Sequence, residues 1–169
     1  RRQRQMCIRD SNVHLENGRG VYTFCMCPGG YVVGAASETG GVVTNGMSEY
    51  ARDGQNSNAA LLVGITPEDF GSAHPLAGIE FQRKIERAAF EAGGGAYSAP
   101  CQRVGDLLEN RATTALNGSV QPTYRPGVVP GDLRTVLPDY ICDSMAEDIR
   151  RMGRRLRGFD DLDLSLIHI

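Results

Sequence analysis

Two cysteines beside a glycine turn are the residues best placed for chemistry in this chain. The stretch Val21–Val33 contains Cys25 and Cys27, and the turn Pro28–Gly30 follows directly. Because side chains alternate along a strand, we expect both thiols on one face. Glycine lets a flat ligand approach the backbone closely, so this strand end could form one wall of a redox cofactor site.

A second polar cluster lies a short distance further along the chain. Arg52 is the nearest cation in sequence that could lower the pKa of either thiol. Asn45 and Asn58 could donate or accept amide hydrogen bonds at a ligand edge. Their alternative role is to stabilise tight turns, in which asparagine is favoured.

The block from about Gly20 to Asp163 resembles the uncharacterised FAD-dependent dehydrogenases, also described as NAD(FAD)-utilising dehydrogenases. This resemblance implies an oxidoreductase that uses FAD, with NAD(P)H as a possible electron donor and a small-molecule substrate. Family members carry glycine-rich FAD-binding segments upstream and downstream of this block. The block itself contains no Gly-x-Gly-x-x-Gly after a strand, so the resemblance implies the substrate-side part of a two-domain protein, covering the isoalloxazine.

These residues define the candidate site and leave alternatives open. The candidate catalytic residues are Cys25, Cys27 and Arg52. The candidate cofactor-binding residues are Cys27, Pro28, Gly29, Gly30, Asn45 and Asn58. One alternative is a non-catalytic interaction or flavin-capping module, and another is a thiol-redox protein that uses the two neighbouring cysteines. The cysteine spacing does not match a structural zinc site, so no metal is expected.

The two ends of the chain have a different origin in our interpretation. Residues 1–10 match one reading frame of a transposase adapter used to build sequencing libraries, and residues 164–169 match a frame of its reverse complement. We therefore expect both ends to be adapter-derived scars that pack poorly, and residues 11–163 to be a fragment of the flavin-capping domain. The alternative for the first end is a basic arm that binds nucleic acid.

Composition limits the class of protein. Without those ends the chain has 14 basic and 19 acidic residues and a net charge of −5, compared with −2 for the whole sequence. An acidic balance argues against a general nucleic-acid binder. No apolar run approaches the roughly 20 residues of a membrane span. We expect a cytoplasmic protein with reduced thiols.

Hydrophobic patterns predict an α+β fold, with an antiparallel sheet in the first half followed by two main helices. Val21–Met26 and Tyr31–Ala36 are expected to pair as a hairpin, with a buried strand at Ala59–Ile65. Apolar spacing predicts one helix from about Pro75 to the glycines at 93–95 and another over Pro138–Arg157. Residues 116–130 are expected to form an extended loop.

Overall fold

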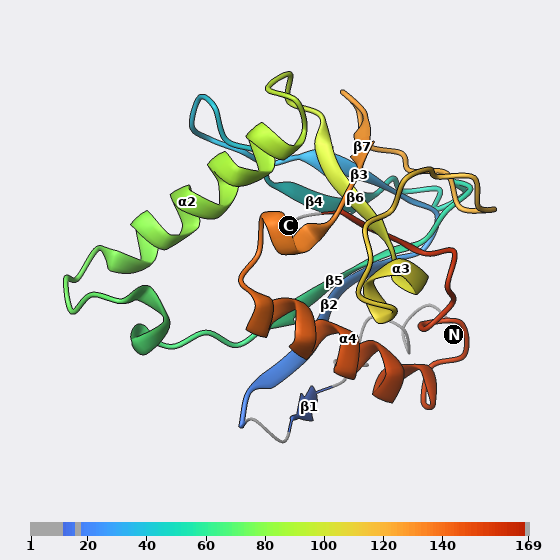
Figure 1. Ribbon diagram of the computed structural model, residues 1–169. Helices are drawn as coiled ribbons and strands as arrows, with labels where there is room; N and C mark the ends of the chain where they lie inside the picture. Colours follow the sequence, from blue (N-terminus) through green and yellow to red (C-terminus); the bar gives the residue numbers. More distant parts are fainter. Residues whose placement is uncertain (1–11, 16–17, 168–169) are drawn as a thin grey trace.

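Short strands and two long helices form an α+β fold in the computed structural model, which describes residues 12–15 and 18–167 (Figure 1). The elements in chain order are β1 (Asn12–His14), β2 (Gly20–Cys27), β3 (Gly30–Gly34), β4 (Thr44–Ser48), β5 (Asn58–Val63), the 3-10 helix η1 (Pro67–Phe70), α2 (Ala77–Ala92), β6 (Ala99–Arg103), α3 (Val104–Leu108), β7 (Val128–Pro130), the 3-10 helix η2 (Leu133–Thr135), α4 (Asp139–Gly153) and β8 (Ser165–Ile167).

The first half folds into two small antiparallel sheets, so the prediction of a single sheet is wrong. Strands β1, β2 and β5 form one sheet in that order, and β3 pairs with β4 in the other. The predicted hairpin is therefore wrong as well, because β2 and β3 belong to different sheets. The turn at Pro28–Gly29 carries the chain from one sheet to the next. Asn45 and Gly46 lie within β4, opposite Val33 and Val32.

A bulge interrupts β2 at the cysteines. Phe24 pairs with Ala60 and Cys27 pairs with Asn58, so β2 contains one more residue than β5 over this interval. Cys25 has a φ of 48°, in the left-handed region. The prediction that Cys25 and Cys27 share a face assumed regular alternation, and the extra residue breaks that alternation.

A third sheet, which the sequence patterns did not predict, lies in the second half. Strand β6 pairs in parallel with β7 and antiparallel with β8. The expectation that residues 164–169 pack poorly is wrong for 164–167, because Leu164 and Leu166 pack against one core cluster and Ile167 against another. The alternating apolar residues of this segment suit a strand. Residues 1–10 and 168–169 lie outside the described residues.

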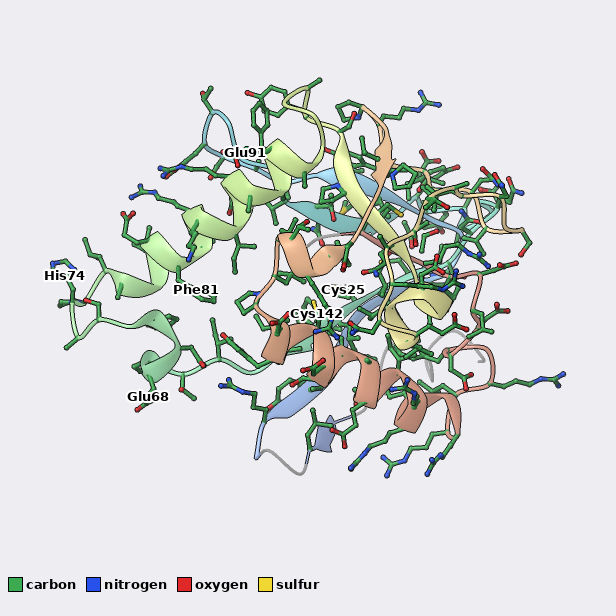
Figure 2. The ribbon with its side chains drawn as sticks, in the orientation of Figure 1. Cys25, Glu68, His74, Phe81, Glu91 and Cys142 are labelled. Carbon is green, nitrogen blue, oxygen red and sulfur yellow. The ribbon has the colours of Figure 1, made fainter. Side chains whose placement is uncertain are left out.

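The two predicted helices are present with shorter bounds. Helix α4 lies across β2 and β5, and α2 packs beside β6 (Figure 1). The connection before α2 is a turn in which His74 Nδ1 accepts a hydrogen bond from the Leu76 N–H at 3.1 Å. Figure 2 shows His74 at the tip of this connection, far from the sheets. Among the described helices, none combines the length and the apolar character needed to cross a bilayer.

The inner face of α4 forms the main core and contains one unexpected acid. Ile141, Met145, Ile149 and Met152 are buried, as their spacing predicted. Asp148 is also buried, with 0% of its surface exposed, and within the described part of the chain neither carboxylate oxygen has a hydrogen-bond partner. Burial raises the pKa of Asp148 to about 6, because the charged form loses its hydration, while Arg151 acts in the opposite direction.

We expect Asp148 to give stability an unusual dependence on pH. Its pKa is higher in the folded chain than in the unfolded chain, so the folded state holds the proton more tightly. Wild-type stability, relative to Asp148→Asn, should therefore fall by roughly 2–3 kcal/mol as the pH rises from about 4 to 6, and then level off. Denaturant unfolding followed by circular dichroism at several pH values measures this difference.

The matched control is Gln55→Asn, which alters an exposed loop residue and removes no titratable group. Its difference from wild type should stay constant over the same pH range. A constant difference for Asp148→Asn too would show that its carboxyl is hydrated in solution.

Candidate functional site

An apolar cavity of about 430 Å³ lies where the three sheets meet. Its walls include Val32 on β3, Thr44 on β4 and Leu61 on β5, together with Ile149 on α4 and Phe159 beyond it. Small-molecule sites typically measure about 300–1,000 Å³ and combine apolar walls with a few polar groups. The cavity therefore has the size and character of a small-molecule site.

The chemistry of the cavity comes from a small number of side chains. Thr44, Asn58 and Thr123 contribute polar groups, and the Thr123 hydroxyl accepts a hydrogen bond from the Val32 N–H at 3.0 Å. Arg157 is the one charged residue among the described lining residues. Part of another wall is Leu164–Ile167, for which the sequence predicts an adapter origin. The walls on β3, β4 and β5 are independent of that segment.

Two glycines beside the cavity, Gly29 and Gly30, allow separate segments of the backbone to pass very close to each other. A Cβ added to Gly29, whose φ is 57°, would lie 2.1 Å from the carbonyl oxygen of Arg52. A Cβ on Gly30 would lie 2.4 Å from the Met47 oxygen. The Gly30 N–H donates to the Asn56 oxygen at 2.8 Å. These glycines are thus required by backbone packing, whereas the sequence had suggested ligand approach as the reason.

Asn58, on β5, contacts the same region of close backbone packing. Its amide nitrogen donates to the Tyr31 carbonyl oxygen at 3.3 Å, and a Cβ on Gly46 would lie 2.0 Å from its Oδ1. Asn45 lies within β4, where its side chain accepts a hydrogen bond from the Gly46 N–H at 2.9 Å, so it does not stabilise a tight turn. Asn58 therefore has a structural role in addition to its position on the cavity wall.

The structure brings only part of the predicted site to the cavity. Of the candidate cofactor-binding residues, Gly30 and Asn58 line it. The described lining does not include the remaining candidates: Cys25, Cys27, Pro28, Gly29, Asn45 and Arg52. Their roles remain predictions. Arg52 contacts Gly29 through its backbone, and its own φ of 52° is in the left-handed region.

The four cysteines of the described chain lie in different environments. Cys25 is exposed and Cys27 is half-buried, while Cys101 and Cys142 are buried. Figure 2 places Cys142 on α4. Burial raises the pKa of Cys101 and of Cys142 to about 11, against smaller opposing effects of Ser165 and Arg134 respectively. The buried pair is therefore inert at neutral pH, as expected of small core residues.

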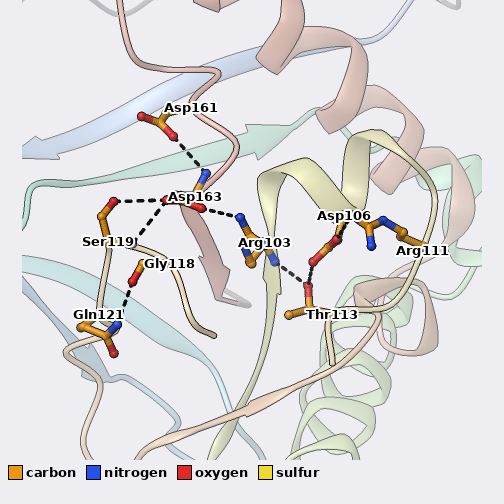
Figure 3. Close-up of polar contacts among 9 residues, drawn as sticks. All are labelled: Arg103, Asp106, Arg111, Thr113, Gly118, Ser119, Gln121, Asp161 and Asp163. Carbon is orange, nitrogen blue, oxygen red and sulfur yellow. Dashed lines mark hydrogen bonds and ion pairs between the residues drawn. The ribbon is translucent and has the colours of Figure 1, made fainter. Parts of the chain in front are cut away.

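A polar network fastens the long loop after α3 to the wall of the cavity (Figure 3). Asp163 pairs with Arg103, and its other oxygen accepts hydrogen bonds from the Ser119 backbone and hydroxyl, both at 3.3 Å. These interactions lower the pKa of Asp163. The Thr113 hydroxyl donates to buried Asp106 at 2.6 Å and accepts from the Arg103 N–H. The network fixes residues 113–119, next to lining residue Val120.

A second hollow, between α3 and α4, is a weaker candidate. It measures about 520 Å³, but its charged residues are already paired. Arg134 binds Asp139 and Asp143, and Arg150 donates to the Leu108 carbonyl oxygen. The described residues also contain no cluster of His, Cys, Asp and Glu suited to a metal ion.

Comparison with known proteins identifies the family of the chain. The sequence model of a family described as "FAD-dependent protein, C-terminal domain-like" matches residues 9–169. The chain belongs to this family. It is also 49% identical over 151 residues to an uncharacterized protein of Clostridium beijerinckii, a match that covers 89% of this chain and 28% of that protein. The chain thus spans little more than a quarter of the relative it matches.

Sequence reasoning missed most of the cavity wall. Val32 and Thr44 occupy inward positions of β3 and β4, and the two-residue period of each strand could have found them once the pairing was known. Thr123 and Arg157 reach the cavity from a loop and from the chain after α4. Their sequence positions carry no signal for this placement.

We expect Gly46 and Asn58 to be energetically coupled. Gly46→Ala should destabilise the chain by about 1–3 kcal/mol, because the new methyl group overlaps the Asn58 amide. In the double variant with Asn58→Ala the overlap is gone, so the double variant should be destabilised by less than the sum of the two single variants. Gly131→Ala is the control, since its added Cβ meets open space. If denaturant unfolding shows that the two losses of stability are additive, the close contact between Gly46 and Asn58 is contradicted.

Thiol reactivity should follow burial. Among the four cysteines of the described residues, iodoacetamide should alkylate Cys25 fastest and Cys27 more slowly in the folded chain, because only exposed thiolates react. Cys101 and Cys142 should react only after denaturant is added. Peptide mass spectrometry assigns each site separately. Rapid alkylation of Cys142 in the native chain would contradict its placement in the core.

Proposed function

We propose that this chain forms the substrate-facing side of the flavin site in an FAD-dependent oxidoreductase. The cavity at the meeting point of the three sheets is the observation that carries the proposal. Membership of a family of FAD-dependent proteins supports the choice of cofactor. FAD, when bound, exchanges a hydride or electrons with a substrate. NAD(P)H is the candidate electron donor.

The residues present fit the ring end of the cofactor better than its phosphates. The cavity walls are mainly apolar, and Thr44 and Asn58 contribute polar groups next to them. A pyrophosphate requires a glycine turn at a helix N-terminus. Of the two long helices, α2 begins after Leu76 and α4 after Pro138, and no glycine-rich turn directly precedes either helix. The dinucleotide end therefore needs residues from elsewhere.

The chain's own side chains would then serve three tasks. The apolar walls, such as Val32 and Leu61, exclude water from the reacting atoms. The Thr123 hydroxyl, held by the Val32 N–H, offers a positioned donor. Arg157 supplies positive charge at the cavity, which favours a substrate with an anionic group.

Flavin titration tests the proposal, and the lack of tryptophan in the chain keeps the protein background low. Lumiflavin, which has the ring without the phosphates, should bind weakly, with a Kd on the order of 0.1–1 mM, and FAD should bind no more than about threefold more tightly. Ala59→Phe fills the cavity and should weaken lumiflavin binding at least about tenfold.

Ala51→Phe, in an exposed loop, is the matched control and should leave binding unchanged. If lumiflavin does not bind, or binds equally to the Ala59→Phe variant, the cavity is not the flavin site. Submicromolar binding of FAD would show that the chain carries a phosphate site of its own.

A further inference from the structure

The four strands β2–β5 carry no charged side chain. Their sequences are GVYTFCMC, GYVVG, TNGMS and NAALLV, so none of the 18 basic and 20 acidic residues of the chain lies on them. Elsewhere the chain places charges on exposed surface, as with Arg83, Lys84 and Glu91 on α2. Sheet surfaces that face water ordinarily carry charges, which also prevent association.

Strand register shows which side of each sheet is exposed. Tyr22 pairs with Leu62 and Phe24 with Ala60, so these side chains share the face of the first sheet opposite Val21 and Val63. Phe24 is 53% exposed and Leu62 is 42% exposed. Large apolar side chains grouped on one sheet face mark an interaction surface.

The second sheet repeats this arrangement. Tyr31 pairs with Met47, and Val33 lies two residues beyond Tyr31 on the same face. Met47 is 51% exposed, and the other two are also exposed. The opposite sides of both sheets line the same cavity, and β4 contacts β2 and β5. We call the exposed large apolar residues on the outer sides of these two sheets the neutral face: Tyr22, Phe24, Leu62, Tyr31, Val33 and Met47.

We propose that the neutral face docks the part of the longer FAD-dependent protein that lies outside the matched stretch. The match to the Clostridium beijerinckii relative covers 28% of that protein, so 72% of its length is available to cover this face. An uncharged, aromatic-rich face suits a protein partner with an apolar surface. It does not suit nucleic acid, whose phosphate backbone is bound mainly through cationic side chains.

The neutral face is separate from the cavity, so the docking surface and the flavin site can be tested independently. The cavity wall uses the inward residues of the same strands, such as Val32, Thr44 and Leu61. A partner docked on the outer side would hold in place the sheets that shape the cavity, and it would not enter the cavity.

Hydroxyl-radical footprinting tests this proposal. We compare the 169-residue chain alone with a chimera in which it replaces the matched stretch of the relative, loaded with FAD. Oxidation of Tyr22, Phe24 and Met47 should be at least about fivefold slower in the chimera, because an interface core excludes water. Tyr50, which is fully exposed after β4, is the internal control and should be oxidised equally in both.

Two charge substitutions sharpen the result. Phe24→Lys and Leu62→Lys should restore oxidation of Met47 in the chimera, while Leu76→Lys, which alters an exposed apolar residue before α2, should not. The chain alone should keep its circular dichroism spectrum in all three variants. The same footprint on the full-length relative, at the positions that match Tyr22 and Phe24, does not depend on folding of the chimera.

Equal oxidation of the neutral face in the chain and in the full-length proteins would overturn the proposal. So would a stable dimer of the 169-residue chain, measured by light scattering, that dissociates on Phe24→Lys. That outcome would assign the neutral face to a second copy of the chain.

Discussion

Close backbone packing around the turn between β2 and β3 is the constraint on which the arrangement of the first half depends. The chain leaves one sheet at Pro28, turns at Gly29 and enters the other at Gly30. There it lies so close to Arg52 and Met47 that no side chain fits. Because the two sheets meet at this point, their inner faces can border one cavity. A single Cβ at this point would force one sheet away from the other.

Polar interactions hold the remaining walls where hydrophobic packing is thin. Gln102 is buried on β6, and its amide donates to the Arg111 carbonyl oxygen while its oxygen accepts from the Leu133 N–H. The Arg103–Asp163 pair and its partners then hold the loop near Val120. Breaking the Gln102 hydrogen bonds would leave buried polar groups without partners, so these bonds favour one position of the chain around Arg111 and Leu133. Asp148, by contrast, is buried at a cost that hydrophobic packing of α4 must offset.

The two sides of the small sheets have different roles. Their inner residues shape an apolar cavity, and their outer residues form an uncharged surface. A strand whose two faces both avoid charge is typical of a sheet covered on both sides. The same property explains why the alternation of apolar and polar residues is weak in β2–β5, and why the strand register could not be deduced from it.

The sequence by itself determined the strands β2, β3 and β5, the two long helices, the family and the core face of α4. Helical spacing found Ile141, Met145 and Ile149, since a period of 3.6 residues is read locally. The block from about Gly20 to Asp163 carried the family resemblance, which the match over residues 9–169 confirms.

Tertiary structure alone decided the sheet partners, the bulge and the cavity. Strand pairing depends on residues far apart in the chain, so β2 could pair with β5 instead of β3 without any local signal. The bulge then moved Cys25 out of the alternation that the sequence implied. Gly30, Asn58 and Arg157 meet at one cavity only because three separate segments pack together, and that packing is a property of the whole fold.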